Sequence, residues 1–292
     1  MRLFFLAAAA LLTTAPLPNR PKTPRPVIII VHGRGHVDAD SAALRRVWQR
    51  DLDSALTSVG LPKLASGDVR LAWYADVLDP DFESSCVVPD SETDSLGLVT
   101  FARDFLGSLV STLPRNESRE VRGLLGDLLY VLDASRHCAA ERRIGNAIET
   151  AASENRPVIV VAYSLGSLVT YGYLHARASD SRPLPDLHLI TIGSPLGNRE
   201  VRELLGQGGD SLRVPPNVRA WENVYDPHDG FAAPLEGSAP RAVRDRITES
   251  AVSDGDPHHI GRYLRDRATG AAIGRALCAS ARTELGDACR RL

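Results

Sequence analysis

The sequence has no strong excess of charge, no basic run and no internal repeat. Its 292 residues include 34 lysines and arginines and 36 aspartates and glutamates, which gives a formal net charge of −2. The arginines are spread among acidic residues, as on an ordinary solvated surface. We therefore expect no polyanionic partner and no nucleic-acid binding.

Long apolar runs are also scarce, and beyond the N-terminus no segment is apolar enough to span a membrane. At the N-terminus, Arg2 precedes a short apolar block at 3–12, which is typical of a secretory signal peptide. We assign 1–15 to that signal and 16–26 to a proline-rich linker, and we expect export to the periplasm or the medium. Cleavage after the signal would leave Pro16 first, which signal peptidase tolerates poorly. The cleavage site therefore stays open, with an uncleaved anchor as the alternative.

Cysteine is rare, with four residues and no Cys-x-x-Cys pair. In an oxidising compartment an even number of cysteines favours disulfides over metal ligation. We favour the pairs Cys86–Cys138 and Cys278–Cys289, which close one loop inside an insertion and one at the C-terminus. The alternative is four reduced, buried thiols.

The rest of the chain alternates apolar runs with amphipathic stretches. Val158 to Val161 is an unbroken β-branched run after Pro157, which is typical of a strand buried on both faces of a parallel sheet. The alternation favours an α/β fold, with an open, mostly parallel sheet flanked by helices and ligands at the carboxyl ends of the strands. The predicted strands are 27–31, 69–74, 158–161, 187–192, 218–225 and an edge strand at 241–248, and the predicted helices include 41–59, 139–153 and 260–277.

Residues 79–138 interrupt this alternation. The segment is polar and contains short helical patterns at 96–113 and 121–132. We interpret it as a lid-like insertion over the sheet, within one domain that spans 27–292. The insertion is also the candidate for contact with a membrane surface.

Ser164 lies where the buried strand must turn into a helix. Helical spacing of apolar residues begins at Leu165, so the chain turns sharply between Ala162 and Leu165. Ala162 and Gly166 are small, as a tight turn requires. Such a turn would lift the Ser164 hydroxyl above the sheet and would aim the Leu165 N–H, at the start of a helix, toward an oxyanion. The alternative is an ordinary strand followed by a serine helix cap.

Two acidic and histidine-containing stretches follow later strands, at Asp226-Pro227-His228-Asp229 and at Asp256-Pro257-His258-His259. A serine nucleophile needs a base within hydrogen-bond reach, and the base needs a carboxylate to fix its tautomer. We choose Asp229 over Asp226, because it lies farther into the loop. We choose His258 over His259, because Pro257 fixes its approach and the helix starts just afterwards. Asp226 and His259 are the alternatives for the two roles, and a metal site on the same residues is a further alternative.

The stretch His32-Gly33-Arg34-Gly35 follows the first buried strand, and its glycines let the main chain approach a ligand closely. We predict that the Arg34 and Leu165 N–H groups form an oxyanion hole. A glycine-rich turn at a strand end is the plain alternative.

Taken together, these motifs resemble the α/β-hydrolase superfamily, in its lipase-like and esterase-like members. The order serine, aspartate, histidine is that of the superfamily, and the turn around Ser164 resembles its nucleophile elbow, with Ala162 in place of the usual first glycine. The resemblance covers residues 27–280 and begins at the strand before His32. It implies a catalytic triad of Ser164, Asp229 and His258.

The resemblance also implies a function. We expect an exported serine esterase or lipase-like hydrolase that cleaves a lipid or other acyl ester and needs no cofactor or metal ion. A thioesterase or an acyltransferase would carry the same triad. A binding protein with the same fold but no activity is the alternative from another class. Acyl length and oligomeric state stay open.

Overall fold

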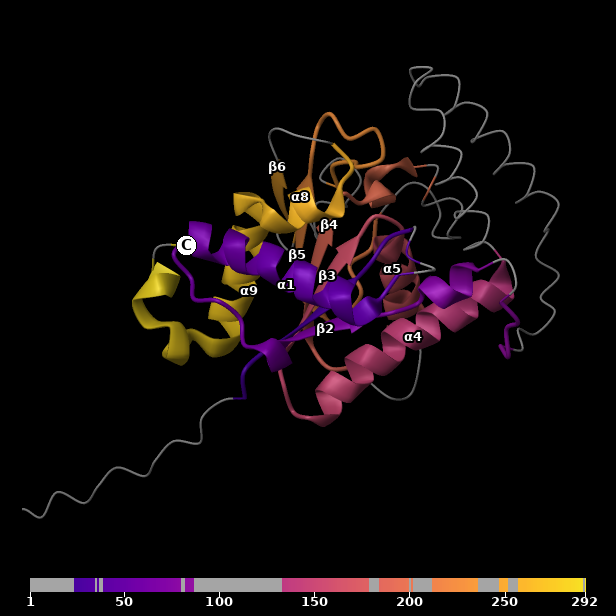
Figure 1. Ribbon diagram of the computed structural model, residues 1–292, viewed down its shortest axis with the longest axis horizontal. Helices are drawn as coiled ribbons and strands as arrows, with labels where there is room; N and C mark the ends of the chain where they lie inside the picture. Colours follow the sequence, from indigo (N-terminus) through magenta and orange to yellow (C-terminus); the bar gives the residue numbers. More distant parts are fainter. Residues whose placement is uncertain are drawn as a thin grey trace, which may run out of the picture.

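The computed structural model describes residues 24–34, 36, 39–79, 82–86, 133–178, 184–199, 201, 212–235, 247–251, 257–290 and 292. The predicted signal segment, residues 16–23 of the linker and residues 87–132 of the predicted insertion lie outside these residues. In the part of the chain that is described, the strands form one sheet with helices on both faces, which is an α/β architecture (Figure 1).

The sheet is built from short, mostly apolar strands. They are β1 (Val27–Val31), β2 (Val69–Ala72), β3 (Val158–Tyr163), β4 (Leu187–Ile192), β5 (Val218–Tyr225) and β6 (Ile247–Ala251). All neighbouring pairs are parallel, and the strands lie in the order β2-β1-β3-β4-β5-β6. Every residue of β1 and β3 is buried, as expected for central strands that helices cover on both faces.

The helices form one layer on each face of the sheet. They are α1 (Ser41–Ser58), α4 (Ala134–Ser153), α5 (Leu165–Ala178), α8 (Ile260–Arg265) and α9 (Arg267–Leu285). Residues of α1, α8 and α9 join Ile28 and Ile30 in one core cluster, while residues of α4 and α5 join Ile29 and Val31 in the other (Figure 1). Alternate residues of β1 belong to different clusters because successive side chains of a strand point to opposite faces.

The strands agree closely with the sequence prediction. Those at 27–31, 187–192 and 218–225 have the predicted bounds. The edge strand β6 spans Ile247–Ala251 and so continues beyond the predicted end at 248; residues 241–246 of the prediction lie outside the described residues. Its position at the edge of the sheet is as predicted, and its neighbour is β5.

Two helix starts differ from the prediction, and an aspartate accounts for each; the last helix also continues to Leu285, beyond the predicted end at 277. α4 begins at Ala134, before the predicted start at 139, because the Asp133 carboxylate accepts hydrogen bonds from N–H groups of the first turn. The predicted helix over 260–277 is two helices. The chain is extended at Asp266, whose carboxylate accepts a hydrogen bond from the Ala268 N–H at 2.7 Å and so starts α9 anew.

Both predicted disulfides are present. The Cα atoms of Cys86 and Cys138 are 6.0 Å apart, and those of Cys278 and Cys289 are 5.6 Å apart, which are ordinary disulfide distances. The first bond ties the start of the predicted insertion to α4, and the second ties α9 to the C-terminal turn Gly286–Arg290. The pairing indicates an oxidising environment. Among the described helices, none is long and apolar enough to cross a membrane.

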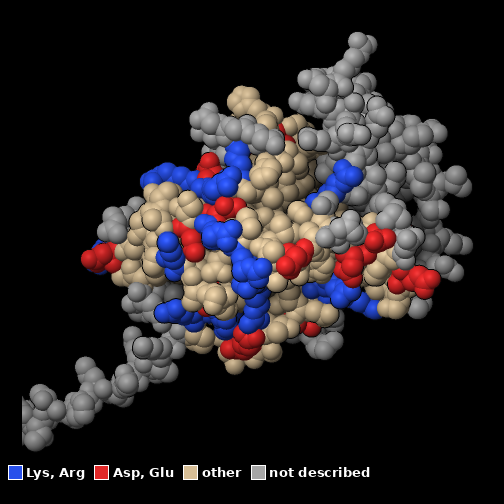
Figure 2. Space-filling model, viewed as in Figure 1, with Lys and Arg blue, Asp and Glu red and all other residues tan. Residues whose placement is uncertain are grey.

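Basic and acidic side chains lie next to one another on the face that carries α1 (Figure 2). Some of them form ion pairs between helices, as where Arg265 of α8 reaches Asp51 of α1 at 3.3 Å. Mixed charge of this kind is typical of a solvated surface.

Candidate active site

Ser164 lies at the turn between β3 and α5. β3 ends at Tyr163 and α5 begins at Leu165, so the chain changes from strand to helix within one residue. Ser164 has a φ of +49°, a left-handed conformation that costs a non-glycine residue about 1–2 kcal/mol. Its N–H donates to the Ile192 carbonyl oxygen at 3.1 Å, which fixes the turn to the end of β4. The sharp turn predicted from the sequence is therefore present.

Two glycines let the chain after β1 pass directly beside this turn. A Cβ atom on Gly33 would lie 3.2 Å from the Cβ of Ser164, and one on Gly166 would lie 2.3 Å from the His32 carbonyl oxygen. The tight turn alone predicts a small residue at 166, and the structure shows that the main chain of His32 is its close neighbour, so the two glycines allow the loop after β1 to approach the turn.

Three of the predicted site residues form a chain of hydrogen bonds. Ser164 Oγ lies 3.0 Å from His258 Nε2, and His258 Nδ1 lies 2.7 Å from Asp229 Oδ2. Ser164 and Asp229 are buried, whereas the His258 side chain is partly exposed. With its proton on Nδ1, the imidazole donates to Asp229 and presents Nε2 to the serine hydroxyl. This arrangement can activate a serine as a nucleophile.

The topology of the sheet brings these side chains together. Ser164 follows β3, Asp229 follows β5, and His258 lies between β6 and α8, so all three lie past the carboxyl ends of parallel strands. The strand order places β2 on one side of β1 and β3 on the other, which makes the β1–β3 boundary a topological switch point. Open α/β sheets bind ligands in the crevice at such a point.

The two aspartates after β5 have different partners. Asp229 faces His258, whereas Asp226 forms a buried ion pair with Arg262 of α8 at 2.6 Å and accepts a hydrogen bond from the His228 N–H at 2.8 Å. Burial alone would raise the pKa of Asp226, but the hydrogen bonds from His228 and Arg262 outweigh burial and hold this pKa below its usual value. Asp226 therefore ties the loop after β5 to α8.

The two neighbouring histidines also differ. His258 belongs to the hydrogen-bonded chain with Ser164, whereas His259 occupies the N-cap position of α8 and forms no side-chain capping bond there. A Cβ atom on Gly261 would lie 3.1 Å from His259 Cε1 and 3.3 Å from Asp51 Oδ2. The His259 ring therefore lies beside α8, next to α1.

Further contacts hold Asp229 and His258 in place, and they come from two residues that carry no recognisable signal in the sequence, Tyr263 and Phe231. Tyr263 donates a hydrogen bond to Asp229 Oδ2 at 2.8 Å, and the Phe231 N–H donates to Asp229 Oδ1 at 2.9 Å. The Phe231 ring lies 4.8 Å from the His258 ring between centroids. In the sequence, Tyr263 is one residue of a predicted amphipathic helix, so only its place in the fold identifies it.

The predicted oxyanion donors lie on two adjoining segments. Leu165 is the first residue of α5, so its N–H is one of the four that have no acceptor within the helix, at the positive end of the helix dipole. Arg34 follows Gly33, which contacts the Ser164 turn, and the Arg34 side chain is exposed. The oxyanion role of these two N–H groups stays a prediction.

His32 fixes the loop that leads to Arg34. The Tyr74 N–H donates to His32 Nε2 at 3.1 Å, and the Tyr74 hydroxyl donates to the His32 carbonyl oxygen at 2.6 Å. The two rings stack with centroids 4.2 Å apart. Burial lowers the pKa of His32 to about 3, so its ring is neutral at ordinary pH. The loop after β1 is therefore anchored to the end of β2.

Neither a scan of protein-family models nor a search of curated proteins found a match to this chain. The functional interpretation therefore rests on the geometry of the site. Across the described ranges, no three His, Cys, Asp or Glu side chains are grouped so that they could hold a metal ion.

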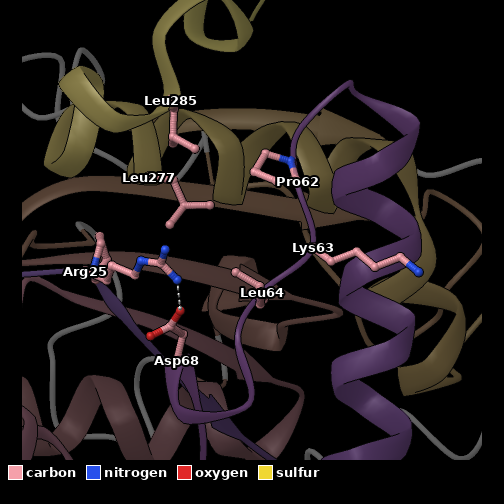
Figure 3. A pocket seen from close by; sticks show the side chains of 8 residues that line it. Arg25, Pro62, Lys63, Leu64, Asp68, Leu277 and Leu285 are labelled. Carbon is pink, nitrogen blue, oxygen red and sulfur yellow. Dashed lines mark ion pairs between the residues drawn. The ribbon is translucent and has the colours of Figure 1, made fainter.

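A cavity of about 230 Å³ lies near the other end of the strands (Figure 3). Leu277 and Leu285 of α9 point into it, toward Arg25, which precedes β1 and pairs with Asp68 at 3.9 Å. None of the predicted site residues lines it. Its lining residues are Arg25, Pro26, Pro62, Lys63, Leu64, Asp68, Leu277 and Leu285.

Proposed function

We propose that this protein is a serine hydrolase of the α/β-hydrolase superfamily that cleaves a carboxylic ester through an acyl-enzyme intermediate. The observation that carries the proposal is the hydrogen-bonded chain from Ser164 through His258 to Asp229. A serine hydroxyl is a weak nucleophile near neutral pH, and this chain supplies a base with a buried carboxylate behind it. The parallel sheet and the position of the chain at its switch point support the proposal.

In the first half of the reaction, His258 Nε2 takes the proton of the Ser164 hydroxyl as Oγ attacks the ester carbonyl carbon. The imidazolium that forms is stabilised by the Asp229 carboxylate, which stays ionised. The carbonyl oxygen becomes an oxyanion, and the N–H groups of Leu165 and Arg34 are the proposed donors to it. When the intermediate collapses, His258 returns the proton to the leaving alcohol, and the acyl group stays on Ser164.

In the second half, His258 takes a proton from a water molecule, whose oxygen attacks the acyl carbon. Collapse of the second tetrahedral intermediate breaks the bond to Ser164 Oγ, which recovers its proton from His258. The products are a carboxylic acid and the free enzyme. An alcohol in place of water would give acyl transfer with the same residues.

We propose a lipid or other acyl ester as the substrate, with the insertion at 79–138 acting as a lid that contacts a membrane surface. This part of the proposal comes from the resemblance to lipase-like members of the superfamily, since fold alone does not determine the substrate. The two disulfides favour an exported protein, in agreement with the proposed signal peptide at 1–15.

A fluorophosphonate probe tests the proposal, because it bonds covalently to an activated serine. We expect the wild type to be labelled and Ser164→Ala to be unlabelled, with kcat on a short-chain nitrophenyl ester reduced about 10⁶-fold. Ser280→Ala is the matched control, since the Ser280 hydroxyl donates to the Ala276 carbonyl oxygen within α9, at 2.9 Å. An unlabelled wild type would favour a binding protein. Labelling of Ser164→Ala would show that another residue is the nucleophile.

A further inference from the structure

Tyr263 is a fully buried residue of α8 whose hydroxyl joins both ends of the loop after β5. The hydroxyl donates to Asp229 Oδ2 at 2.8 Å and accepts a hydrogen bond from the Asp226 N–H at 3.0 Å. Asp229 Oδ2 is also the oxygen that faces His258 Nδ1. The same carboxylate oxygen therefore receives two donors, and the second of them has its own position fixed by the main chain.

The ring of Tyr263 is held as firmly as its hydroxyl. A Cβ atom on Gly193 would lie 2.9 Å from Tyr263 Cε2, so the ring packs directly against the turn that follows β4. Gly193 has a φ of +55°, which a residue with a side chain rarely adopts. The Tyr163 ring lies on the same side, with its centroid 6.2 Å away. The ends of β3, β4 and β5 thus fix the direction of the Tyr263 hydroxyl, through Tyr163, Gly193 and the Asp226 N–H.

The environment of the Tyr263 hydroxyl favours its protonated, hydrogen-bond-donating form. Burial and the charge of Asp229 raise the pKa of Tyr263 far above its usual value. The charged and titratable groups around this hydroxyl are Asp229, His258, and Asp226 with its ion-paired Arg262. The hydroxyl and the His258 imidazole both contact Asp229 Oδ2, so Tyr263 is the second donor to that oxygen.

We propose that Tyr263 is a positioning residue of the triad. Its hydroxyl holds the Asp229 carboxylate toward His258 and, by hydrogen bonding, partly offsets the negative charge on Asp229 Oδ2. This inference rests on the proposed function of the triad. Without the hydroxyl, the full charge of Oδ2 would act on the imidazole, so the protonated form of His258 would be more stable and its pKa would rise. The carboxylate would also lose one of the contacts that fix its orientation, which lowers kcat.

Tyr263→Phe tests this role in the full-length exported protein. We expect kcat for a nitrophenyl butyrate to fall about tenfold with KM nearly unchanged, because a hydrogen bond to a charged group is lost. The acidic limb of kcat/KM, which reports His258, should move to higher pH. Tyr171→Phe is the matched control, since Tyr171 is equally buried and its hydroxyl is hydrogen-bonded to the main chain of Arg213, at 3.0 and 3.2 Å. Tyr171→Phe should change neither kcat nor the pH of the acidic limb of kcat/KM.

A histidine NMR titration separates this inference from the proposed function. If the wild type neither hydrolyses esters nor reacts with the fluorophosphonate, the proposed function fails, but a raised His258 pKa in Tyr263→Phe still supports the positioning role. An unchanged His258 pKa in a folded Tyr263→Phe overturns it. If that variant does not fold, a site-specific difluorotyrosine at position 263 keeps the hydroxyl and makes it a stronger donor. The His258 pKa should then fall, and a value equal to that of the wild type would refute the proposal.

Discussion

Replacing each of the two aspartates after β5 by asparagine should separate catalysis from stability. Asp229→Asn removes the carboxylate that orients His258, so we expect kcat to fall about 10⁴-fold, as when a triad loses its acid. Asp226→Asn leaves that contact intact and should change kcat by less than about tenfold, since Asp226 reaches the site only through the loop and α8. The two substitutions change the same chemical group within one loop, so each is the control of the other.

The stability effect should have the opposite order. The side chains of Asp226 and Arg262 are 2% and 11% exposed and form an ion pair at 2.6 Å. Removing one partner of a buried pair typically costs 3–5 kcal/mol. We expect about 3 kcal/mol for Asp226→Asn, the low end of that range, because Arg262 also donates to the Pro257 carbonyl oxygen at 3.3 Å. Asp229→Asn keeps a side-chain oxygen that can accept the Phe231 N–H, so its loss of unfolding free energy should be smaller.

The pH dependence of unfolding provides a second check. Because the pKa of Asp226 is lowered in the folded state, its contribution to stability is complete above its unfolded pKa of about 3.9. The contribution is lost as the pH falls through the lower, folded value. Urea unfolding from neutral to acid pH should therefore show this loss in the wild type and not in Asp226→Asn. If Asp226→Asn loses as much kcat as Asp229→Asn at unchanged stability, the assignment of the acid is wrong.

Two further predictions concern the histidines and a disulfide. His258→Ala should reduce kcat nearly as much as loss of Ser164, while His259→Ala should be mild, and the reverse result in ester hydrolysis would exchange their roles. Replacing Cys86 and Cys138 by serine should lower the free energy of unfolding by roughly 4 kcal/mol on a loop-entropy estimate for a separation of 52 residues. Chemical denaturation measures this, and equal stability of the variant would contradict it.

The strands and the order of the site residues were predictable because local signals determine them. Short, unbroken β-branched runs such as 27–31 and 158–161 favour buried strands, and parallel strands bring their carboxyl ends to one edge. Because Ser164 and the loops after β5 and β6 all come at carboxyl ends of strands, their position at one edge of the sheet could be predicted. The break at Asp266 was missed, because a single capping aspartate inside a helical pattern resembles an exposed helix residue.

The choice between neighbouring residues needed the structure. Asp226 and Asp229 are separated by one tight turn, and only the placement of Arg262 on α8 shows which carboxylate is already paired. Tyr263 is missed for a related reason, since its partner Asp229 is 34 residues away and helical periodicity says only that the ring is buried. Sequence patterns report burial and spacing, whereas these assignments depend on which side chains meet across elements.

The left-handed conformation of Ser164 sets activity and stability against each other. At a φ of +49° a serine costs the native state about 1–2 kcal/mol. Glycine would relieve this strain, but it carries no hydroxyl. Directed evolution for heat tolerance alone would therefore discard the residue on which the proposed reaction depends, whereas selection for ester turnover would retain it. Variants chosen for thermostability must accordingly be screened for turnover as well.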